Sequence, residues 1–256
     1  MNTPQAVCRN IGGVQKDRIP HSPEWRDVHP QSGRMPNGAI RGRTEVIFPV
    51  ARTPRLWLDE VMKILVVYCH PSPTSFNGQI LAAVDQALLG HSVTVLDLYA
   101  EKFDPVMSAE EWQNYMAGGA PNRTLHARHI DLLQRADALV FIFPTWFYGP
   151  PAVLKGWLER VWLPEVAFTV PETANGRIAG RLHNIRHCVV ITTSGSPRWW
   201  LWWVRNPARN LFRRGLKGLF HPKCALRWFQ LYRMDHVNDR DRARFLARIK
   251  RGLSTL

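Results

Sequence analysis

The chain has 256 residues, 45% of them hydrophobic and 21% charged, which is typical of a soluble globular protein with one sizeable core. The net charge of +14 is uneven: residues 198–256 hold 15 Lys and Arg against three Asp and Glu, whereas residues 62–197 hold ten against eleven. The four dispersed cysteines form no C-x-x-C pair, which excludes a disulfide framework and a zinc site of that type and indicates a reducing, cytoplasmic compartment.

Residues 1–61 are expected to form an irregular N-terminal extension. They contain seven prolines and no sustained apolar period, so they lack the pattern of an independently packed domain. The sequence changes at Met62, which has the look of a native start followed directly by a buried strand, so the upstream segment is also compatible with a mis-assigned start. We therefore expect the catalytic domain over residues 62–256.

Strand and helix patterns alternate through this second part. Short apolar or β-branched runs predict strands at residues 64–69, 93–98, 138–143, 188–193 and 224–231. Helical spacing of apolar residues predicts helices at residues 77–89, 124–136, 152–162 and 239–251, with a further helical stretch in the Trp-rich segment 198–220. The alternation predicts an α/β fold with a doubly wound, five-stranded parallel sheet and helices on both faces. The apolar run at residues 138–154 is broken by prolines and glycine, so no transmembrane helix is expected.

The loops at the carboxyl ends of the strands should carry the chemistry. After the first strand, residues 69–77 form a hydroxyl-rich turn that leads into a helix, where Thr74 and Ser75 can help helix amides to bind a phosphate. The alternative, of similar weight, is that one of these hydroxyls only caps the helix. The loop has no G-x-G-x-x-G, which argues against a dinucleotide-binding Rossmann loop.

Two further loops fit a flat ligand. The third strand is followed by three consecutive aromatic residues between prolines, a combination that supplies an apolar wall and unpaired backbone amides. The alternative is an aromatic cluster that covers the end of the core. The fourth strand is followed by small, hydroxylated residues at 192–196 that allow close approach of a ligand.

With the helix of residues 152–161, these loops resemble the flavodoxin-like NAD(P)H:quinone oxidoreductase family, which includes DT-diaphorase and the ancillary flavoproteins of bacterial potassium-efflux systems. The resemblance covers roughly residues 62–197 and implies a flavin, FMN or FAD, with NAD(P)H as co-substrate. It implies that the flavin is bound by His70, Ser75, Phe76, Asn77, Thr145, Trp146, Phe147, Tyr148, Thr192, Thr193, Ser194 and Gly195. It places Phe168 at the substrate pocket, although Val170 stands where an aromatic residue is common, and it implies a homodimer.

No catalytic protein group is expected, because hydride transfer is the flavin's own reaction. His126 and His129 lie three residues apart in a predicted helix without a third ligand nearby, so we expect them to be solvated and expect no metal site.

Three functions fit these patterns. The leading hypothesis is a flavin-dependent NAD(P)H oxidoreductase that reduces quinones or similar two-electron acceptors. The alternatives are a flavin-binding regulatory subunit of a membrane transporter and a flavodoxin-type electron carrier. The Trp- and Arg-rich segment 198–220 is compatible with a peripheral membrane contact at the inner face of the membrane. Packing on the sheet or on a partner subunit is favoured over it, because Asn206 and Pro207 interrupt the helical face. No nucleic-acid-binding motif accompanies the basic charge.

Overall fold

The computed structural model describes residues 61–171 and 176–256. Of the extension expected over residues 1–61, all but Val61 lies outside the described residues. From Met62 onward, strands and helices alternate along the chain as the sequence predicts.

Five strands form one all-parallel sheet, in the order β2-β1-β3-β6-β7. Their bounds are β1 Lys63–Tyr68, β2 Ser92–Asp97, β3 Ala138–Pro144, β6 His187–Thr193 and β7 Ala225–Leu231. The chain winds outward from β1 in both directions, which is the doubly wound topology. The predicted fold class is therefore confirmed, and each predicted strand lies within one or two residues of its observed bounds.

The central strands are buried on both faces because their side chains alternate between two hydrophobic cores. In β1, Leu65 and Val67 belong to one core, whereas Ile64 and Val66 belong to the other. The continuous apolar run read from the sequence is the consequence of this two-sided burial.

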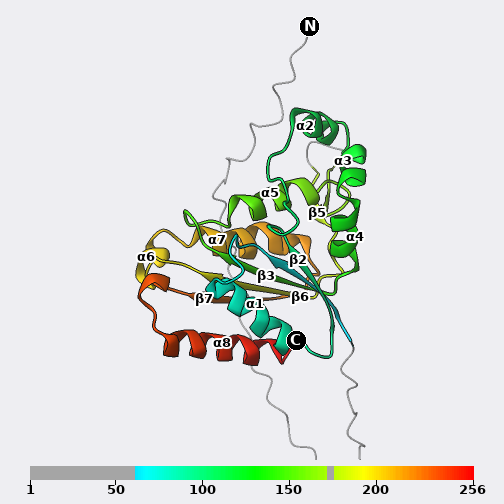
Figure 1. Ribbon diagram of the computed structural model, residues 1–256. Helices are drawn as coiled ribbons and strands as arrows, with labels where there is room; N and C mark the ends of the chain where they lie inside the picture. The colour runs from blue at the N-terminus through cyan, green and yellow to red at the C-terminus, as the bar shows by residue number, and fades with distance from the viewer. Residues whose placement is uncertain (1–60, 172–175) are drawn as a thin grey trace, which may run out of the picture. The chain divides into compact units, whose positions relative to one another are not determined.

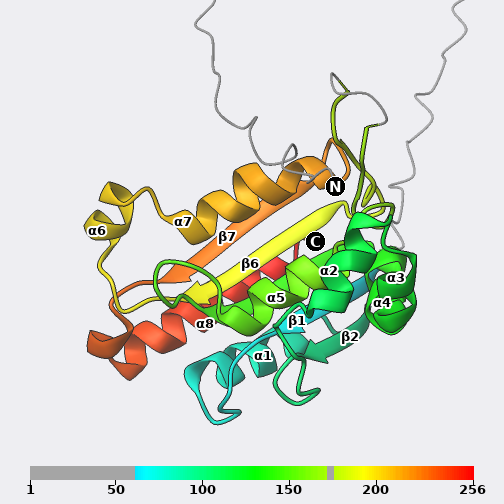
Figure 2. The same ribbon diagram turned by 90° about the horizontal axis from the view of Figure 1, so that it is seen from above.

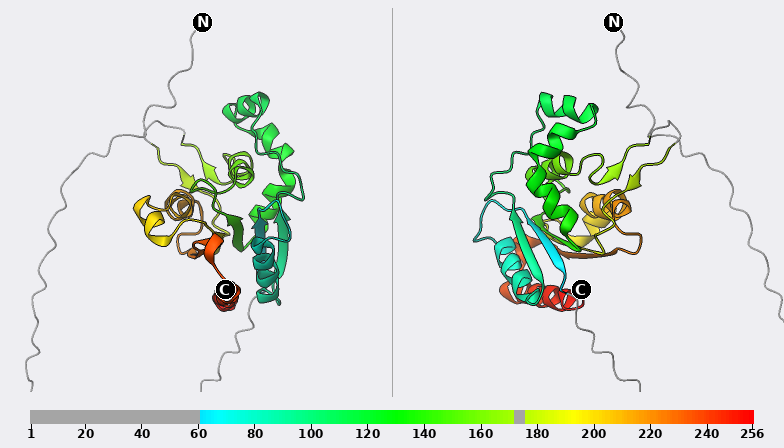
Figure 3. Two further views of the ribbon diagram at one scale, coloured as in Figure 1. Left: turned by 60° about the vertical axis from the view of Figure 1, so that its left-hand side comes forward. Right: turned by 90° about the vertical axis from the view of Figure 1, so that its right-hand side faces the viewer.

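Helices cover both faces of the sheet. On one face α1 (Phe76–Ala87) and α8 (Asp239–Leu253) lie side by side (Figures 1 and 3). On the other face lie α4 (Ala127–Arg135), α5 (Ala152–Val161) and the π-helical turn η1 (Leu211–Leu216). Each core therefore lies between one face of the sheet and the helices that cover that face.

The segment between β2 and β3 is richer in helices than predicted. The helix expected over residues 124–136 is interrupted, because α3 (Ala120–Leu125) ends before His126 and α4 begins after it. Helix α2 (Ala109–Met116) was not predicted, although its capping box is visible in the sequence: Ser108 accepts from the Glu111 amide and the Glu111 carboxylate accepts from the Ser108 amide.

The helical stretch of residues 198–220 is broken into pieces. Helix α6 (Arg198–Trp203) ends before Arg205 and Asn206, which both have positive φ angles, and α7 (Pro207–Asn210) follows directly. Pro207 explains the break, because a proline disfavours helical backbone at the residue before it. The chain continues through η1 and η2 (Lys217–Leu219) to β7, which is followed by η3 (Met234–His236).

A small hairpin, also not predicted, follows α5. It pairs β4 (Phe168–Thr169) with β5 (Ala179–Gly180) in antiparallel fashion. The segment after the hairpin lies at the amino ends of the central strands, because the Asn184 side chain donates to the Ala136 carbonyl and the Arg186 amide donates to the Asp137 carbonyl.

Candidate functional site

The loops after β1, β3 and β6 meet at one edge of the sheet. All five strands are parallel, so their carboxyl ends lie together, and the chain reverses its winding direction between β1 and β3. Figure 2 shows the loops that leave β3 and β6 at this edge, with α6 beyond them. The Thr145 amide joins two of the loops by donating to the Thr193 carbonyl at 2.7 Å.

The loop after β1 is organised around the start of α1. The His70 ring accepts from the Ser72 amide at its Nδ1, at 3.0 Å. Ser75 is the N-cap of α1, and its hydroxyl accepts from the Gly78 amide at 3.3 Å. The capping role considered for this hydroxyl is therefore observed. Among the described residues the amides of Phe76 and Asn77 have no backbone or side-chain acceptor, so they remain free to bind an anion at the helix N-terminus.

Gly78 allows this loop to lie directly on the helix. A Cβ atom at this position would lie 2.0 Å from the Pro73 carbonyl oxygen, far inside van der Waals contact. Only glycine lets the loop approach so closely, and the loop in turn sets where the free amides point.

Asn77 links the first loop to the third. Its side chain is only 4% exposed, and Nδ2 donates to Oγ1 of Thr193 at 3.4 Å. Its Oδ1 atom is buried without a hydrogen-bond partner in the part of the chain that the structure describes. A buried polar atom of this kind is costly unless a ligand or water satisfies it.

The loop after β3 forms a tight turn from Trp146 to Gly149. The two residues exchange backbone hydrogen bonds of 3.0 and 2.9 Å. The two central residues, Phe147 and Tyr148, have φ angles of 45° and 65°, which bulky side chains seldom adopt. Phe147 is fully exposed, which does not fit a cluster covering the core. Strained, exposed aromatic residues are typical of ligand-binding loops.

Tyr148 is held from the other side by the segment after β6. Trp200 donates from Nε1 to the Tyr148 hydroxyl at 2.9 Å, and the Ala208 amide donates to the Tyr148 carbonyl at 2.9 Å. These two bonds connect the turn to α6 and α7.

The loop after β6 is buried at its base and open at its tip. Thr192 and Thr193 are buried, and the Thr192 hydroxyl lies 2.9 Å from that of Thr145. Ser194 accepts from the Gln230 amide group at 3.3 Å. A Cβ atom at Gly195 would lie 2.8 Å from Oδ2 of Asp235, so the tip has room for no larger residue without a shift of that carboxylate.

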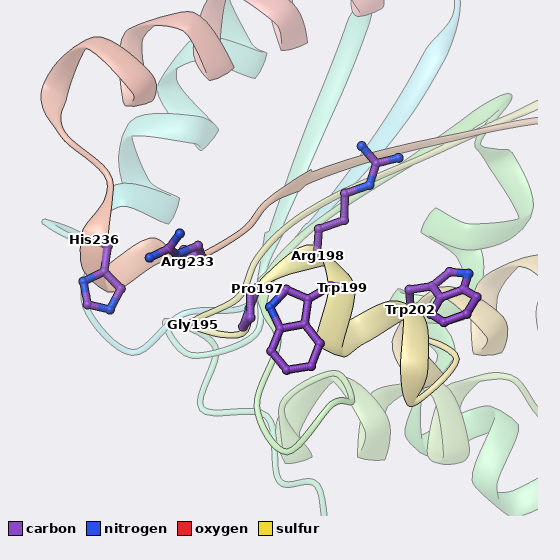
Figure 4. A pocket seen from close by; sticks show the side chains of 7 residues that line it. All are labelled: Gly195, Pro197, Arg198, Trp199, Trp202, Arg233 and His236. Atoms are coloured by element: carbon purple, nitrogen blue, oxygen red, sulfur yellow. The ribbon is translucent and has the colours of Figure 1, made fainter.

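Two adjoining pockets open at this edge. The smaller, about 280 Å³, is lined by Thr145, Phe147, Tyr148, Ser194, Gly195, Ser196 and Leu201. The larger, about 890 Å³, shares Gly195 and is lined further by Pro197, Arg198, Trp199, Trp202, Arg233 and His236 (Figure 4). Arg233 and His236, which line the larger pocket, were not among the residues expected at the site. Both residues follow β7, whose carboxyl end lies at the same edge of the sheet. Their position after the last predicted strand could therefore have identified them.

Eight of the twelve residues expected to bind flavin lie on these three loops. The other four adjoin the loops: Phe76 and Asn77 begin α1, and Thr192 and Thr193 end β6. Phe168 lies elsewhere: it belongs to β4, and the hairpin of β4 and β5 leads into the segment at the amino ends of the strands. Figure 2 shows this hairpin at the opposite end of the sheet from α6. Val170 is exposed beside it. Within one chain, Phe168 is therefore not brought to the loops.

The expectation that His126 and His129 are solvated is wrong. His126 is buried and lies 3.2 Å from Oε1 of Glu111, and the Trp157 indole donates to Nδ1 of His129 at 3.2 Å. The break between α3 and α4 turns His126 inward, which the single predicted helix did not anticipate. Residues 61–171 and 176–256 contain no cluster of three or more side chains suited to a metal ion.

Three cysteines fall within the described residues, and all are buried free thiols: Cys69, Cys188 and Cys224. Burial raises the pKa of Cys69 to about 12 and that of Cys224 to about 11, and it raises the pKa of Cys188 well above its usual value.

Comparison with known proteins gives consistent relatives. A family model described as a flavodoxin-like fold matches residues 62–253. A protein of Escherichia coli named uncharacterized NAD(P)H oxidoreductase YcaK is 37% identical over 111 residues, 41% of this chain and 55% of the relative. Human ribosyldihydronicotinamide dehydrogenase [quinone] is 34% identical over 152 residues, 52% of this chain and 64% of the relative. The chain thus spans less than two thirds of the length of these curated relatives.

Solved structures agree on the fold. The crystal structure of Smu.1420 from Streptococcus mutans is 33% identical, with a TM-score of 0.66 over 76% of this chain and 100% of the other. The NAD(P)H:quinone oxidoreductase from Methanothermobacter marburgensis is 26% identical, with a TM-score of 0.64 over 76% of this chain and 96% of the other.

Proposed function

This chain belongs to the flavodoxin-like fold family, and from that membership we propose that it is a flavin-dependent NAD(P)H oxidoreductase that reduces quinones or similar two-electron acceptors. The carrying observation is the strained aromatic turn from Trp146 to Gly149, which borders a pocket with Gly195 on its other side. Relatives named for NAD(P)H and quinone support the proposal.

The free amides at the start of α1 fit the phosphate end of a flavin, FMN or FAD. Phe76 and Asn77 supply backbone donors and Ser75 a hydroxyl, where the helix dipole favours a negative charge. His70 lies in the same loop. The unpartnered Oδ1 of Asn77 fits a hydroxyl donor from the flavin's ribityl chain.

The aromatic turn and the loop after β6 fit the two sides of the isoalloxazine ring. Thr145, Trp146, Phe147 and Tyr148 supply the apolar wall and its backbone donors. The opposite side is supplied by Thr192, Thr193, Ser194 and Gly195. Glycine at the tip of that loop permits a flat ring to approach the backbone closely.

A bound flavin supplies the hydride transfer itself. The protein's part is to hold the ring against the aromatic wall, to leave one face open for NAD(P)H and then the acceptor, and to limit the access of water. The larger pocket beside Gly195 is wide enough to admit such partners. No side chain needs to act as a nucleophile.

We assign a homodimer to this enzyme. Phe168 lies at the far end of its own sheet, so it can line an acceptor pocket only if a second copy brings its hairpin to this chain's loops. In a two-fold symmetric dimer, each copy would bring its Phe168 hairpin to the loops of the other copy.

The described residues contain no helix long and apolar enough to cross a membrane. We assign the enzyme to the cytoplasm, with a peripheral contact at the inner membrane face through residues 198–220.

An absorption spectrum of the purified protein, followed by identification of the released flavin, tests the cofactor. Steady-state turnover with NADPH or NADH and a water-soluble quinone tests the reaction. Bound flavin without turnover would favour an electron carrier, and flavin-bearing protein that co-purifies with a membrane transporter would favour a regulatory subunit. Protein that neither retains nor takes up flavin would refute the proposal.

A further inference from the structure

Three tryptophans on one short helix are largely exposed, although Trp199 and Trp203 each pack on Trp200 of the same helix. Trp199, Trp202 and Trp203 of α6 are 67%, 80% and 65% exposed. Figure 4 shows the Trp199 and Trp202 rings projecting from this helix, with Arg198 directed the other way from Trp199. A soluble surface seldom leaves several indole rings exposed together without a partner.

Five arginines lie next to these tryptophans. They line one pocket of about 680 Å³ together with Asn206, Asn210 and Tyr232, and they are Arg198, Arg205, Arg209, Arg213 and Arg214. None of them takes part in an ion pair with a described carboxylate. The Nε atom of Arg209 is buried and has no partner in the same part of the chain. The pocket is thus suited to several negatively charged oxygens.

The segment is anchored to the protein by a separate set of side chains. Leu201, Ala208 and Phe212 are almost fully buried, and Phe212 packs on Phe141 and Phe143 of β3. The exposed tryptophans and arginines therefore do not hold the segment in place. They form a surface, here called the docking face, that is available to a partner.

We propose that the docking face binds an anionic phospholipid bilayer, with the indole rings at headgroup depth and the arginines on lipid phosphates. Charge complementarity selects this occupant, because residues 198–220, which carry the docking face, hold six Lys and Arg and no Asp or Glu. Contact of this face with its own copy across a two-fold axis would instead bring like charges together. A lipid surface satisfies both the aromatic rings and the cations.

The docking face is continuous with the proposed flavin site. The larger pocket is lined by Trp199 and Trp202 at one end and reaches Gly195, which also lines the pocket at the aromatic turn. Resting on the proposed oxidoreductase function, this continuity assigns the acceptor to the class of quinones dissolved in the bilayer, which would enter from the membrane side.

Sedimentation with phospholipid vesicles tests the docking. The full chain should sediment with phosphatidylcholine vesicles that contain about 30 mol% phosphatidylglycerol, and binding should fall with added salt. Arg213→Gln with Arg214→Gln, and separately Trp203→Ser, should each lower the partition coefficient about tenfold. The matched control, Arg240→Gln with Arg251→Gln on α8, removes the same charge from exposed positions elsewhere and should change it less than about twofold.

Three results would overturn the docking. These are no sedimentation at low salt, displacement of the protein from vesicles by inorganic phosphate at constant ionic strength, and conversion of a dimer to a monomer by Trp203→Ser in sedimentation velocity. The second would assign the arginine pocket to a free phosphate compound, and the third would assign the face to a subunit contact.

Turnover separates this inference from the proposed function. The Arg213→Gln, Arg214→Gln variant should reduce a water-soluble quinone at the wild-type rate but a long-tailed quinone embedded in vesicles about tenfold more slowly. Equal loss on both quinones would overturn the assignment of the acceptor to the bilayer. Vesicle binding in a protein that turns over neither quinone would refute the oxidoreductase and leave the docking supported.

Discussion

Arg160 donates from its guanidinium to Oε1 of Glu111 at 2.8 Å, and both side chains are less than one tenth exposed. The pair joins α2 to α5, the helix that begins directly after the site loop. His126 lies 3.2 Å from the same carboxylate oxygen. A buried network therefore fixes the end of α5 that lies farther from the site loop, on a helix about 15 Å long.

Replacing Glu111 with Gln should lower the free energy of unfolding by about 3 kcal/mol, because it leaves the Arg160 charge buried without its partner. Urea denaturation measures the loss. The matched control is Glu159→Gln, which removes a carboxylate from the exposed pair of Lys155 and Glu159 and should cost at most about 0.5 kcal/mol. Equal losses in the two variants would contradict the assignment of the Glu111 pair as the stabilising one.

The same carboxylate should make stability depend on acid pH. Burial alone would raise the pKa of Glu111, but hydrogen bonds from Arg160, the Ser108 amide and His126 outweigh it and lower the pKa from 4.5 to about 2. Because the unfolded chain takes up the proton first, the contribution is complete above pH 4.5 and is lost as the pH falls towards 2. The gap in unfolding free energy between the wild type and Glu111→Gln should shrink across that window. A gap that stays constant down to pH 2.5 would argue against the lowered pKa.

Replacing both Trp146 and Phe147 with Ala should weaken flavin binding at least about tenfold and leave the melting temperature of the flavin-free protein nearly unchanged. Both side chains are exposed on the turn, so they contribute little to the core. Flavin absorbance per protein and thermal denaturation are the two measurements. Trp112→Ala, an exposed tryptophan on α2, is the control and should retain flavin. Unchanged flavin content with a large loss of stability would show that the turn serves packing instead.

Gly78→Ala should displace the loop after β1, because the new Cβ would meet the Pro73 carbonyl oxygen at 2.0 Å. We expect a loss of stability of about 1–3 kcal/mol and, in protein that still folds, weaker binding of flavin. Gly218→Ala is the matched control, since no atom lies within 4 Å of a Cβ there. Isothermal titration with FMN and with FAD separates the binding effect from the stability effect. Wild-type affinity in the Gly78 variant would remove the start of α1 from the proposed phosphate site.

Residues 1–61 should be dispensable for folding and for flavin binding. The family model begins at residue 62, and the upstream segment lacks a pattern able to offset the entropy of ordering it. A protein that starts at Met62 should show wild-type flavin content and turnover. Failure of this shorter protein to fold would show that the extension stabilises the domain.

The sheet could be predicted because its central strands are unbroken apolar runs, such as Ile64 to Cys69. Such runs are typical of strands in a parallel sheet that has helices on both faces. The hairpin of β4 and β5 could not, because two-residue strands are too short to show a period. Helix α2 could have been found from Ser108 and Glu111, whose spacing is that of a capping box.

The site was predictable in its position more than in its detail. Because the strands are parallel, the loops after β1, β3 and β6 lie at one edge of the sheet. The hydroxylated and aromatic residues in those loops then indicate the kind of ligand. The positive φ angles of Phe147 and Tyr148 could not be predicted, because aromatic residues disfavour the tight turn that Trp146 and Gly149 close. Arg233 and His236 were missed although they follow the last strand of the same sheet.

The three buried thiols affect how the chain would withstand the acceptors of its proposed reaction. Quinones are electrophiles that arylate thiolates, so an enzyme that concentrates them risks inactivating itself. Burial raises the pKa of Cys69 to about 12 and that of Cys224 to about 11, and it also raises the pKa of Cys188, so all three strongly favour the neutral thiol. A quinone acceptor of the proposed kind would therefore meet no exposed thiol in the described part of the chain.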